Sequence, residues 1–176
     1  MEFTHKPVLL HECIEALNIR PDGVYVDGTL GRAGHSLEIA QRLATGRLIC
    51  IDRDMAAIEA AKVRLAPYMD RVTLVHSNFS ELGGVLRQAG ASGADGMLFD
   101  LGVSSPQLDD ASRGFSYMQD APLDMRMDLD APLTAYEIVN TWSGDELRRI
   151  LFEYGEERYA PAIARAIVRA RETRPV

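Results

Sequence analysis

The sequence predicts an α/β fold with a parallel sheet over its first hundred residues, followed by a helical segment. Short runs of β-branched, aliphatic and aromatic residues alternate with helical patterns between residues 24 and 101, which is typical of successive βα units. Beyond residue 101 the alternation stops, and helical patterns follow one another without strands. We therefore expect two parts, residues 1–105 and 106–176.

The first part contains four predicted strands, each too short to be a helix: residues 24–27, 47–52, 72–76 and 96–101. Helices are predicted over residues 9–17, 35–44, 55–66 and 80–89. Asp54 is a suitable N-cap for the third helix, and Gly46 a suitable C′ residue after the second. Right-handed crossovers between parallel strands would place these helices on both faces of the sheet.

The second part begins with an irregular stretch. Residues 102–133 are rich in Asp, Ser, Pro, Gly and Met and show neither helix nor strand periodicity, so we expect a long structured loop, which in a compact domain is usually functional or disordered. Thr134 and Ser143 each begin a capping box, which predicts two helix starts. A longer helix is predicted over residues 157–173, with Pro161 in its first turn.

Composition limits the class of protein. The 176 residues are 47% hydrophobic and 26% charged, as in ordinary globular proteins and unlike disordered ones. No apolar run is long enough for a membrane span, and no signal peptide is recognisable. Cys13 and Cys50 form neither a metal-ligand spacing nor a disulfide framework, which favours the cytoplasm and predicts no metal. The net charge of −7 excludes a generally basic surface but not a local basic patch.

A glycine-rich turn follows the first strand, with glycines at positions 28, 31 and 34. Glycines permit a sharp turn and let a ligand approach the backbone, and the helix after the turn offers free N–H groups. The spacing is not the G-x-G-x-x-G of nicotinamide enzymes, which disfavours an oxidoreductase. A turn that binds no ligand is, at this point, an equal alternative.

Three further residues stand at predicted strand ends. Asp52 ends the second strand, 21 residues after Gly31, where an acidic side chain can accept both hydroxyls of a ribose. Phe79 follows the third strand and would cover an adenine face or simply belong to the core. Asp100 ends the fourth strand and would contact a cofactor amino group or a substrate amine, or serve as a turn residue. Together they predict an adenosine pocket.

An ordered series of motifs runs through the chain, at residues His5–Leu10, Asp27–Ser36, Asp100–Asp109, Arg113–Ser116, Pro122–Asp128 and Tyr154–Arg158. With these motifs the chain closely resembles the bacterial 16S ribosomal RNA (cytosine-N4)-methyltransferases of the MraW type over essentially its whole length. The resemblance implies a Rossmann-like class I fold with strand order 3-2-1-4, and S-adenosylmethionine-dependent methylation of one cytidine in the decoding region of 16S rRNA.

The resemblance also implies site residues. Those expected to bind the cofactor in residues 1–105, or just beyond, are Gly31, Ala33, Gly34, His35, Asp52, Phe79, Asp100 and Gln107. The family usually has glycine where this chain has Ala33, and a positive φ there costs alanine on the order of 1 kcal/mol. For catalysis we expect Asp100 and the backbone of Ser104 and Ser105 to accept an N–H bond of the poorly nucleophilic target amine.

Residues 106–176 are expected to recognise RNA. Phe115 or Tyr117 would stack on the target base, or only pack within the loop. Arg158, Arg165 and Arg169 fall close to one helical face, which predicts either a phosphate-binding stripe or a solvated surface.

Proteins of the resembled family are longer than this chain, which stops inside their helical insertion. The strand at residues 96–101 would then be a sheet edge exposing Met97, Leu98 and Phe99, a template for pairing with another chain. We expect self-association through this strand, or a fragment of a longer product. The function is then an active methyltransferase or a cofactor-binding but catalytically impaired module, with a nicotinamide-dependent oxidoreductase less favoured.

Overall fold

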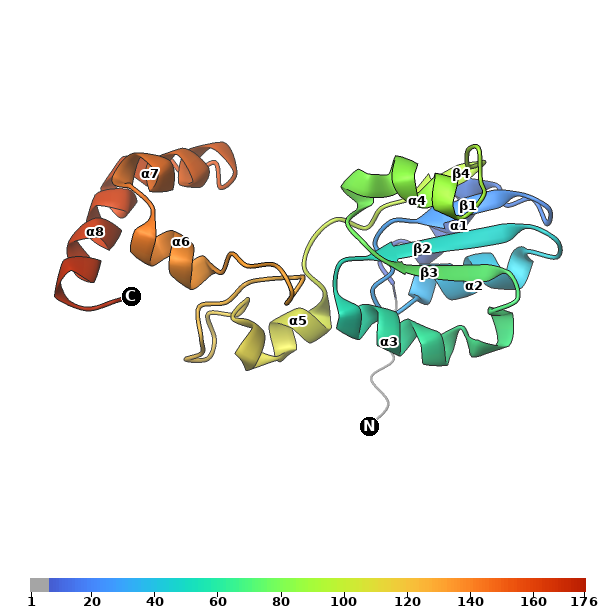
Figure 1. The fold of residues 1–176 in the computed structure, drawn as a ribbon, viewed down its shortest axis with the longest axis horizontal. Helices are drawn as coiled ribbons and strands as arrows, with labels where there is room; N and C mark the ends of the chain where they lie inside the picture. The colour runs from blue at the N-terminus through green and yellow to red at the C-terminus, as the bar shows by residue number, and fades with distance from the viewer. Residues whose placement is uncertain (1–6) are drawn as a thin grey trace. The chain divides into compact units, whose positions relative to one another are not determined.

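The computed structural model describes residues 7–176, which divide after Gly102 into two compact units (Figure 1). The first unit carries a 4-stranded sheet in the order β3-β2-β1-β4, and all three strand pairs are parallel. This confirms the predicted fold class and strand order. The strands are β1 (Val24–Asp27), β2 (Arg47–Asp52), β3 (Val72–His76) and β4 (Gly96–Leu98). The first three have the predicted bounds, whereas β4 ends three residues earlier than expected.

Two hydrophobic clusters hold helices on opposite faces of the sheet (Figure 1). Neighbouring residues of a strand point to opposite faces, so Tyr25 of β1 belongs to one cluster and Val26 to the other. Three helices cover the Tyr25 face, and α4 covers the Val26 face through Val85. These helices are α1 (Leu10–Leu17), α2 (Gly34–Arg42), α3 (Met55–Arg64) and α4 (Leu82–Gln88).

Of two predicted helix-end signals in this unit, one is confirmed and one is not. The Asp54 carboxylate accepts the Ala56 N–H at 3.0 Å and caps α3, as predicted. The prediction for Gly46 is wrong, because α2 ends at Arg42 with the extended residue Leu43 as its C-cap. Gly46 is needed for close packing instead, since a Cβ there would lie 2.3 Å from the Gly23 carbonyl oxygen. Short 3-10 turns follow α3 and precede α4, at η1 (Ala66–Tyr68) and η2 (Phe79–Glu81).

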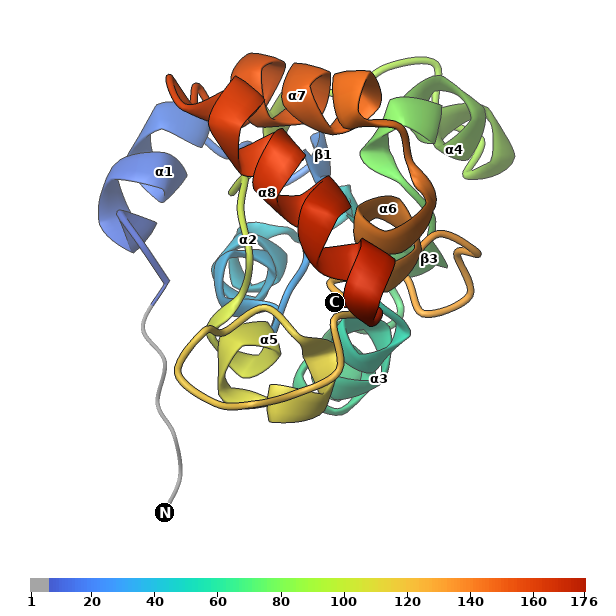
Figure 2. The same ribbon diagram turned by 90° about the vertical axis from the view of Figure 1, so that its left-hand side faces the viewer.

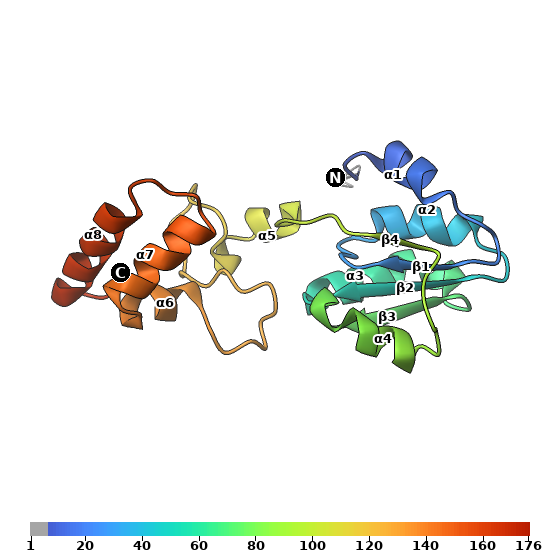
Figure 3. The same ribbon diagram turned by 90° about the horizontal axis from the view of Figure 1, so that it is seen from above.

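The second unit, Val103–Val176, contains helices and an ordered loop. Here α8 packs against α7 and α6 (Figure 2, Figure 3). Both predicted capping boxes are present, at Thr134 and Ser143, and Pro161 lies in the first turn of α8. The bounds are α5 (Ser105–Asp109), η3 (Ala111–Arg113), α6 (Ala135–Thr141), α7 (Gly144–Glu153) and α8 (Ala160–Thr173).

Two predictions for this unit need correction. Residues 102–133 are not loop throughout, because α5 and η3 lie within them. A third capping box, Ser104 with Gln107, begins α5 and was the overlooked signal. Arg158 does not share a helical face with Arg165 and Arg169, since α8 begins only at Ala160.

The remaining loop is held by arginine contacts. The Arg126 guanidinium pairs with Asp124 at 2.7 Å and donates to the carbonyl oxygens of Leu129 and Ala131, both at 2.9 Å. This ion pair lowers the pKa of the Asp124 carboxyl. Arg113, which is buried, donates to the carbonyl oxygen of Arg126 at 2.9 Å. The loop is therefore structured, as expected, although it lacks regular secondary structure.

Candidate active site at the carboxyl edge of the sheet

The glycine-rich turn leaves β1 and leads directly into α2. Gly31 has φ of 50° and Ala33 has φ of 58°, so both adopt the left-handed conformation. Ala33 is the N-cap of α2 and makes no side-chain capping hydrogen bond. Because the first N–H groups of a helix have no intrahelical acceptor, α2 starts with uncapped donors. The φ of 58° also shows that Ala33 adopts the positive φ considered in the sequence analysis.

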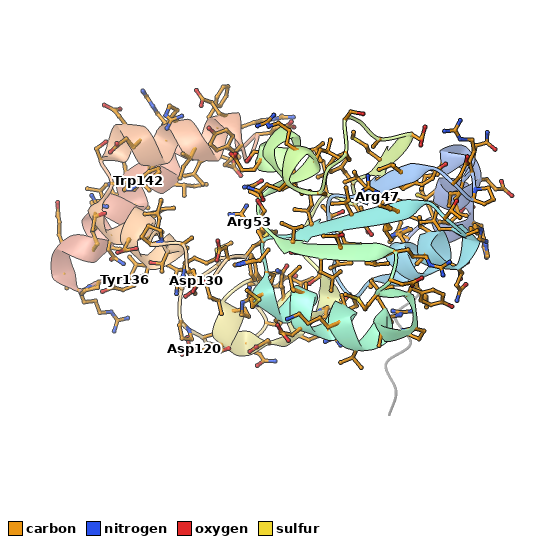
Figure 4. All side chains as sticks on the ribbon, turned by 45° about the vertical axis from the view of Figure 1, so that its right-hand side comes forward. Arg47, Arg53, Asp120, Asp130, Tyr136 and Trp142 are labelled. Carbon is orange, nitrogen blue, oxygen red and sulfur yellow. The ribbon has the colours of Figure 1, made fainter. Side chains whose placement is uncertain are left out.

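Asp52, the last residue of β2, joins this turn to the neighbouring strand. Its Oδ2 accepts the Gly31 N–H at 2.8 Å, and its Oδ1 accepts the Asp54 N–H at 2.9 Å. Burial raises the pKa of the Asp52 carboxyl, while these backbone hydrogen bonds oppose the rise. A carboxylate offers about four acceptor positions, so roughly two remain open. Figure 4 labels both ends of β2, with Arg47 at its start and Arg53 just past its carboxyl end.

Phe79 lies at the same edge, where its ring contacts the ring of Phe99. The sequence had predicted Phe99 only as part of an exposed edge strand. The rings of Phe79 and Phe99 are edge to face, with centroids 5.6 Å apart and planes at 72°. Both remain substantially exposed, at 41% and 40%. A Cβ on Gly28 would lie 2.1 Å from the Phe99 ring, so this ring covers Gly28. The parallel register pairs Asp27 with Leu98 and so sets Gly28 beside Phe99, and no local sequence signal reports this contact.

A buried polar cluster lies beneath the glycine turn, and sequence reasoning gave it no role. Asp27 is 1% exposed, and its two carboxylate oxygens accept the Ser36 hydroxyl at 2.6 Å and the Thr29 N–H at 3.2 Å. The Ser36 oxygen also lies 3.2 Å from the buried Cys50 sulfur. Burial raises the pKa values of both Asp27 and Cys50. The sequence signal that could have indicated this cluster is Asp27 itself, an acidic residue at the end of an apolar strand and directly before Gly28.

Gly34 and His35 are covered from the N-terminal side. The His35 Nε2 lies 3.1 Å from the Val8 carbonyl oxygen. A Cβ on Gly34 would lie 2.2 Å from Cγ of Pro7, so Pro7 packs against the start of α2. Pro7 and Val8 belong to the motif His5–Leu10. His5 and Lys6 of the same motif lie outside the described residues.

Asp100 has a fixed backbone and a free side chain. Its N–H donates to Thr29 Oγ1 at 2.6 Å. Within residues 7–176, its exposed carboxylate makes no hydrogen bond or ion pair. The carboxyl edge of the first unit thus brings together seven predicted residues, namely Gly31, Ala33, Gly34, His35, Asp52, Phe79 and Asp100.

The other predicted residues belong to the second unit. Ser104 is the N-cap of α5, and its N–H donates to Oε1 of the buried Gln107 at 3.0 Å. Ser104, Ser105 and Gln107 thus have structural positions at a helix start. Phe115 is half-buried, whereas Tyr117 is 95% exposed.

The predicted arginines of this unit are solvent-facing. Arg158, Arg165 and Arg169 are exposed, and in the described part of the chain none of them forms an ion pair. Across residues 7–176 there is no cluster of three or more metal-ligating side chains. In that same range, no helix has both the length and the apolar character to cross a membrane.

Comparison with known proteins decides the family. The sequence profile of the MraW methylase family matches residues 2–176. The chain belongs to the MraW methylase family. It is 56% identical to the ribosomal RNA small subunit methyltransferase H of Brevibacillus brevis, a match that covers 100% of this chain and 56% of the relative. It is 58% identical to the protein of the same name from a Paenibacillus species, over 99% of this chain and 57% of the relative.

The family members matched here are longer proteins, and this chain spans a little over half the length of those curated relatives. Among solved structures, an rRNA methylase from Streptococcus thermophilus aligns with 49% of this chain and 51% of its own length, with a TM-score of 0.39 and 16% sequence identity.

Proposed function

We propose that this chain carries the cofactor-binding part of an S-adenosylmethionine-dependent methyltransferase, together with part of its RNA-recognition surface, and that the enzyme methylates N4 of a cytidine in 16S rRNA. Family membership supports the proposal, as do relatives named ribosomal RNA small subunit methyltransferase H. The observation that carries it is the Asp52 carboxylate, which holds the glycine turn at the carboxyl edge of the sheet, where open α/β sheets bind ligands.

The residues present fit an adenosyl cofactor. Asp52 keeps about two acceptor positions for the ribose hydroxyls after its two backbone hydrogen bonds. The uncapped start of α2, at Ala33, Gly34 and His35, offers N–H donors and a favourable dipole to the carboxylate of the amino-acid end. Phe79 exposes an apolar ring for the adenine.

Bound S-adenosylmethionine supplies an electrophilic methyl group on a sulfonium. The transfer is an in-line displacement, so the chain's main contribution is to position the two reactants. The free Asp100 carboxylate would accept an N–H bond either from the target N4 amine or from the cofactor's ammonium. The backbone of Ser104 and Ser105 is the further candidate for the target amine. Gln107, at the start of α5, is proposed to face the cofactor's amino-acid end.

The second unit, which we propose recognises substrate, offers cations to RNA. Arg165 and Arg169, four residues apart, lie on one face of α8, and Arg158 precedes the helix. Unpaired and exposed, all three are available to phosphates. Exposed Tyr117 and half-buried Phe115 are proposed to stack on the target base.

Two finer proposals concern assembly and location. The β4 edge exposes Met97 at 41% and Phe99 at 40%, although Leu98 is buried at 7%, and β4 has a partner strand on one side only. We propose that chains associate through this edge. Light scattering at high concentration should then show dimers or larger species, and a strict monomer would contradict the proposal.

The site of action we propose is the cytoplasm, where small ribosomal subunits are found.

The decisive experiment is transfer of labelled methyl groups from S-adenosylmethionine to isolated small ribosomal subunits. The proposal predicts label on N4 of a single cytidine. Calorimetric titration with S-adenosylhomocysteine and with NAD should show binding of the first only. Binding without transfer would make the chain a cofactor-binding module, and binding of NAD alone would overturn the assignment.

A further inference from the structure

The segment that follows β4 is tied to the glycine turn by a side chain rather than by the sheet. The β1–β4 pairing ends at Asp27 and Leu98, and the Gly28 N–H still donates to the Leu98 carbonyl oxygen at 2.9 Å. Beyond this point the glycine turn departs from the strand direction. The next hydrogen bond between the two segments is from the Asp100 N–H to Thr29 Oγ1, at 2.6 Å. A threonine hydroxyl therefore continues the ladder where the backbone cannot.

The backbone of Thr29 is itself held by the buried side chain of Asp27. Its N–H donates to one carboxylate oxygen of Asp27 at 3.2 Å, and the other oxygen accepts the Ser36 hydroxyl at 2.6 Å. Asp27 and Ser36 are 1% and 0% exposed, so water does not compete for the hydrogen bond between them. The Ser36 hydroxyl has one hydrogen, which leaves the Cys50 S–H as the donor in their 3.2 Å contact. The hydrogen bonds thus link β2, α2, β1, the turn and the segment that follows β4.

The last member of this network carries a charged group that the network does not use. The backbone of Asp100 is held by Thr29, and its carboxylate makes no hydrogen bond or ion pair with the described residues. A group that must meet a ligand at a defined distance needs this combination, because small displacements of reacting groups cost large factors in rate.

We propose that Thr29 is a positioning residue that sets the place of the Asp100 carboxylate at the candidate active site, with Asp27 and Ser36 as its buried support. The proposal rests on the proposed methyltransferase function, because Asp100 needs positioning only if it meets the cofactor or the target amine. The alternative is that the hydroxyl only completes the turn. That alternative predicts an effect on stability alone.

Three variants separate these roles. Thr29→Val removes the hydroxyl at nearly constant volume, and Thr29→Ser restores it. Thr73→Val makes the same chemical change at an exposed position of β3, remote from the turn, and serves as the control. For each protein we would measure hydrogen exchange of the Asp100 amide by NMR, the dissociation constant for S-adenosylhomocysteine, methyl transfer at saturating cofactor, and the melting temperature.

The positioning role predicts that Thr29→Val speeds exchange of the Asp100 amide by about two- to tenfold, since one hydrogen bond is lost. It also predicts a loss of about ten- to a hundredfold in either cofactor affinity or transfer rate, at a melting temperature close to that of Thr73→Val. The affected quantity would show whether Asp100 serves the cofactor or the target. Thr29→Ser should restore both exchange and function.

The outcomes distinguish this inference from the function on which it rests. Unchanged Asp100 exchange in Thr29→Val would overturn the inference, because Thr29 would then not hold Asp100. Full affinity and transfer in that variant would also overturn it, with the methyltransferase function intact. If the unmodified chain neither binds S-adenosylhomocysteine nor transfers methyl groups, the proposed function fails, and the positioning role fails with it even where the exchange result confirms the hydrogen bond.

Discussion

The Asp52 carboxylate, at the end of β2, accepts the backbone N–H of Gly31 at 2.8 Å. The Asp52 side chain thereby fixes the glycine turn beside β2, the strand that ends in this proposed ribose-binding residue. Residues 21 positions apart in sequence become direct partners, and the turn is held in place by the residue that we propose binds the ribose.

Replacing Asp52 with alanine should weaken binding of S-adenosylhomocysteine by about 1–3 kcal/mol, because the partly buried hydrogen bond to Gly31 and the proposed hydrogen bonds to the ribose are lost together. Calorimetric titration would measure the change. Asp70→Ala is the matched control, since Asp70 makes only an exposed ion pair with Arg71, a type of contact that contributes little. Equal affinities for the two variants would remove Asp52 from the site.

Cofactor affinity should fall in acid at a higher pH than an ordinary aspartate would produce. Burial raises the pKa of Asp52 above 3.8, and the ribose hydroxyls need the ionised carboxylate as acceptor. Affinity should therefore drop as the pH falls through that raised pKa. Titrations with S-adenosylhomocysteine between about pH 4 and 7 would show this. The same drop in Asp52→Ala would assign it to another group.

Acid should affect the free energy of unfolding through Asp52 in the opposite direction from cofactor affinity. Between 3.8 and its raised pKa, the folded chain binds the proton more readily than the unfolded chain does. In that window this group makes the free energy of unfolding rise as the pH falls. Comparing denaturant unfolding of the original chain and of Asp52→Asn across the window isolates the contribution, because the amide does not titrate. An identical pH dependence in both would contradict it.

Gly28 and Phe99 should be energetically coupled. A Cβ at position 28 would lie 2.1 Å from the Phe99 ring, so Gly28→Ala must displace that half-exposed ring. Overpacking a closed core costs about 1–3 kcal/mol, and because this ring is the outer end of a half-exposed side chain that can move, the cost should lie near or below the lower end of that range. In Gly28→Ala/Phe99→Ala the clash is absent, so the alanine at 28 should cost much less there. A double-mutant cycle by urea unfolding measures the coupling, and purely additive effects would show that the ring does not occupy this space.

Gly114→Ala should destabilise the second unit by about 2 kcal/mol or more. Gly114 has φ of +71°, and a Cβ there would lie 2.4 Å from the Pro122 carbonyl oxygen, so both strain and a backbone clash oppose alanine. Gly144→Ala is the control in the same unit, because its nearest neighbour would be a side-chain atom of Val168 at 3.6 Å. At that helical position alanine should be neutral or slightly stabilising. Thermal unfolding of the two variants would test the difference.

RNA binding should become less dependent on salt when the α8 arginines are removed. If Arg165 and Arg169 each contact a phosphate, Arg165→Ala/Arg169→Ala should reduce the slope of log K against log salt by about 1.5–2. Filter binding to 16S rRNA segments at several salt concentrations gives the slope. Arg42→Ala, which removes a cation already paired with Glu38 at 2.6 Å in the first unit, should leave it unchanged. Equal slopes would make the arginine stripe a solvated surface.

The sequence by itself determined the architecture and most of the sheet edge. The alternation of short apolar runs with helical patterns predicted the parallel sheet, and the glycine turn and its spacing to Asp52 predicted a ligand site at the carboxyl edge of that sheet. The motif order predicted the family. The prediction of Gly46 as a helix C′ residue was wrong, because that glycine is required by backbone packing against Gly23, which no local pattern reports.

Tertiary structure decided which of these residues meet. That Phe99 lies against Gly28 and Phe79, that Asp27 is sealed beneath the turn, and that the Thr29 hydroxyl holds the Asp100 amide all depend on strand register. Register fixes contacts between residues about 70 positions apart, and such contacts leave no periodic trace along the chain. Local propensities specify elements, whereas the side-chain partners at an edge are set by how the elements are paired in space.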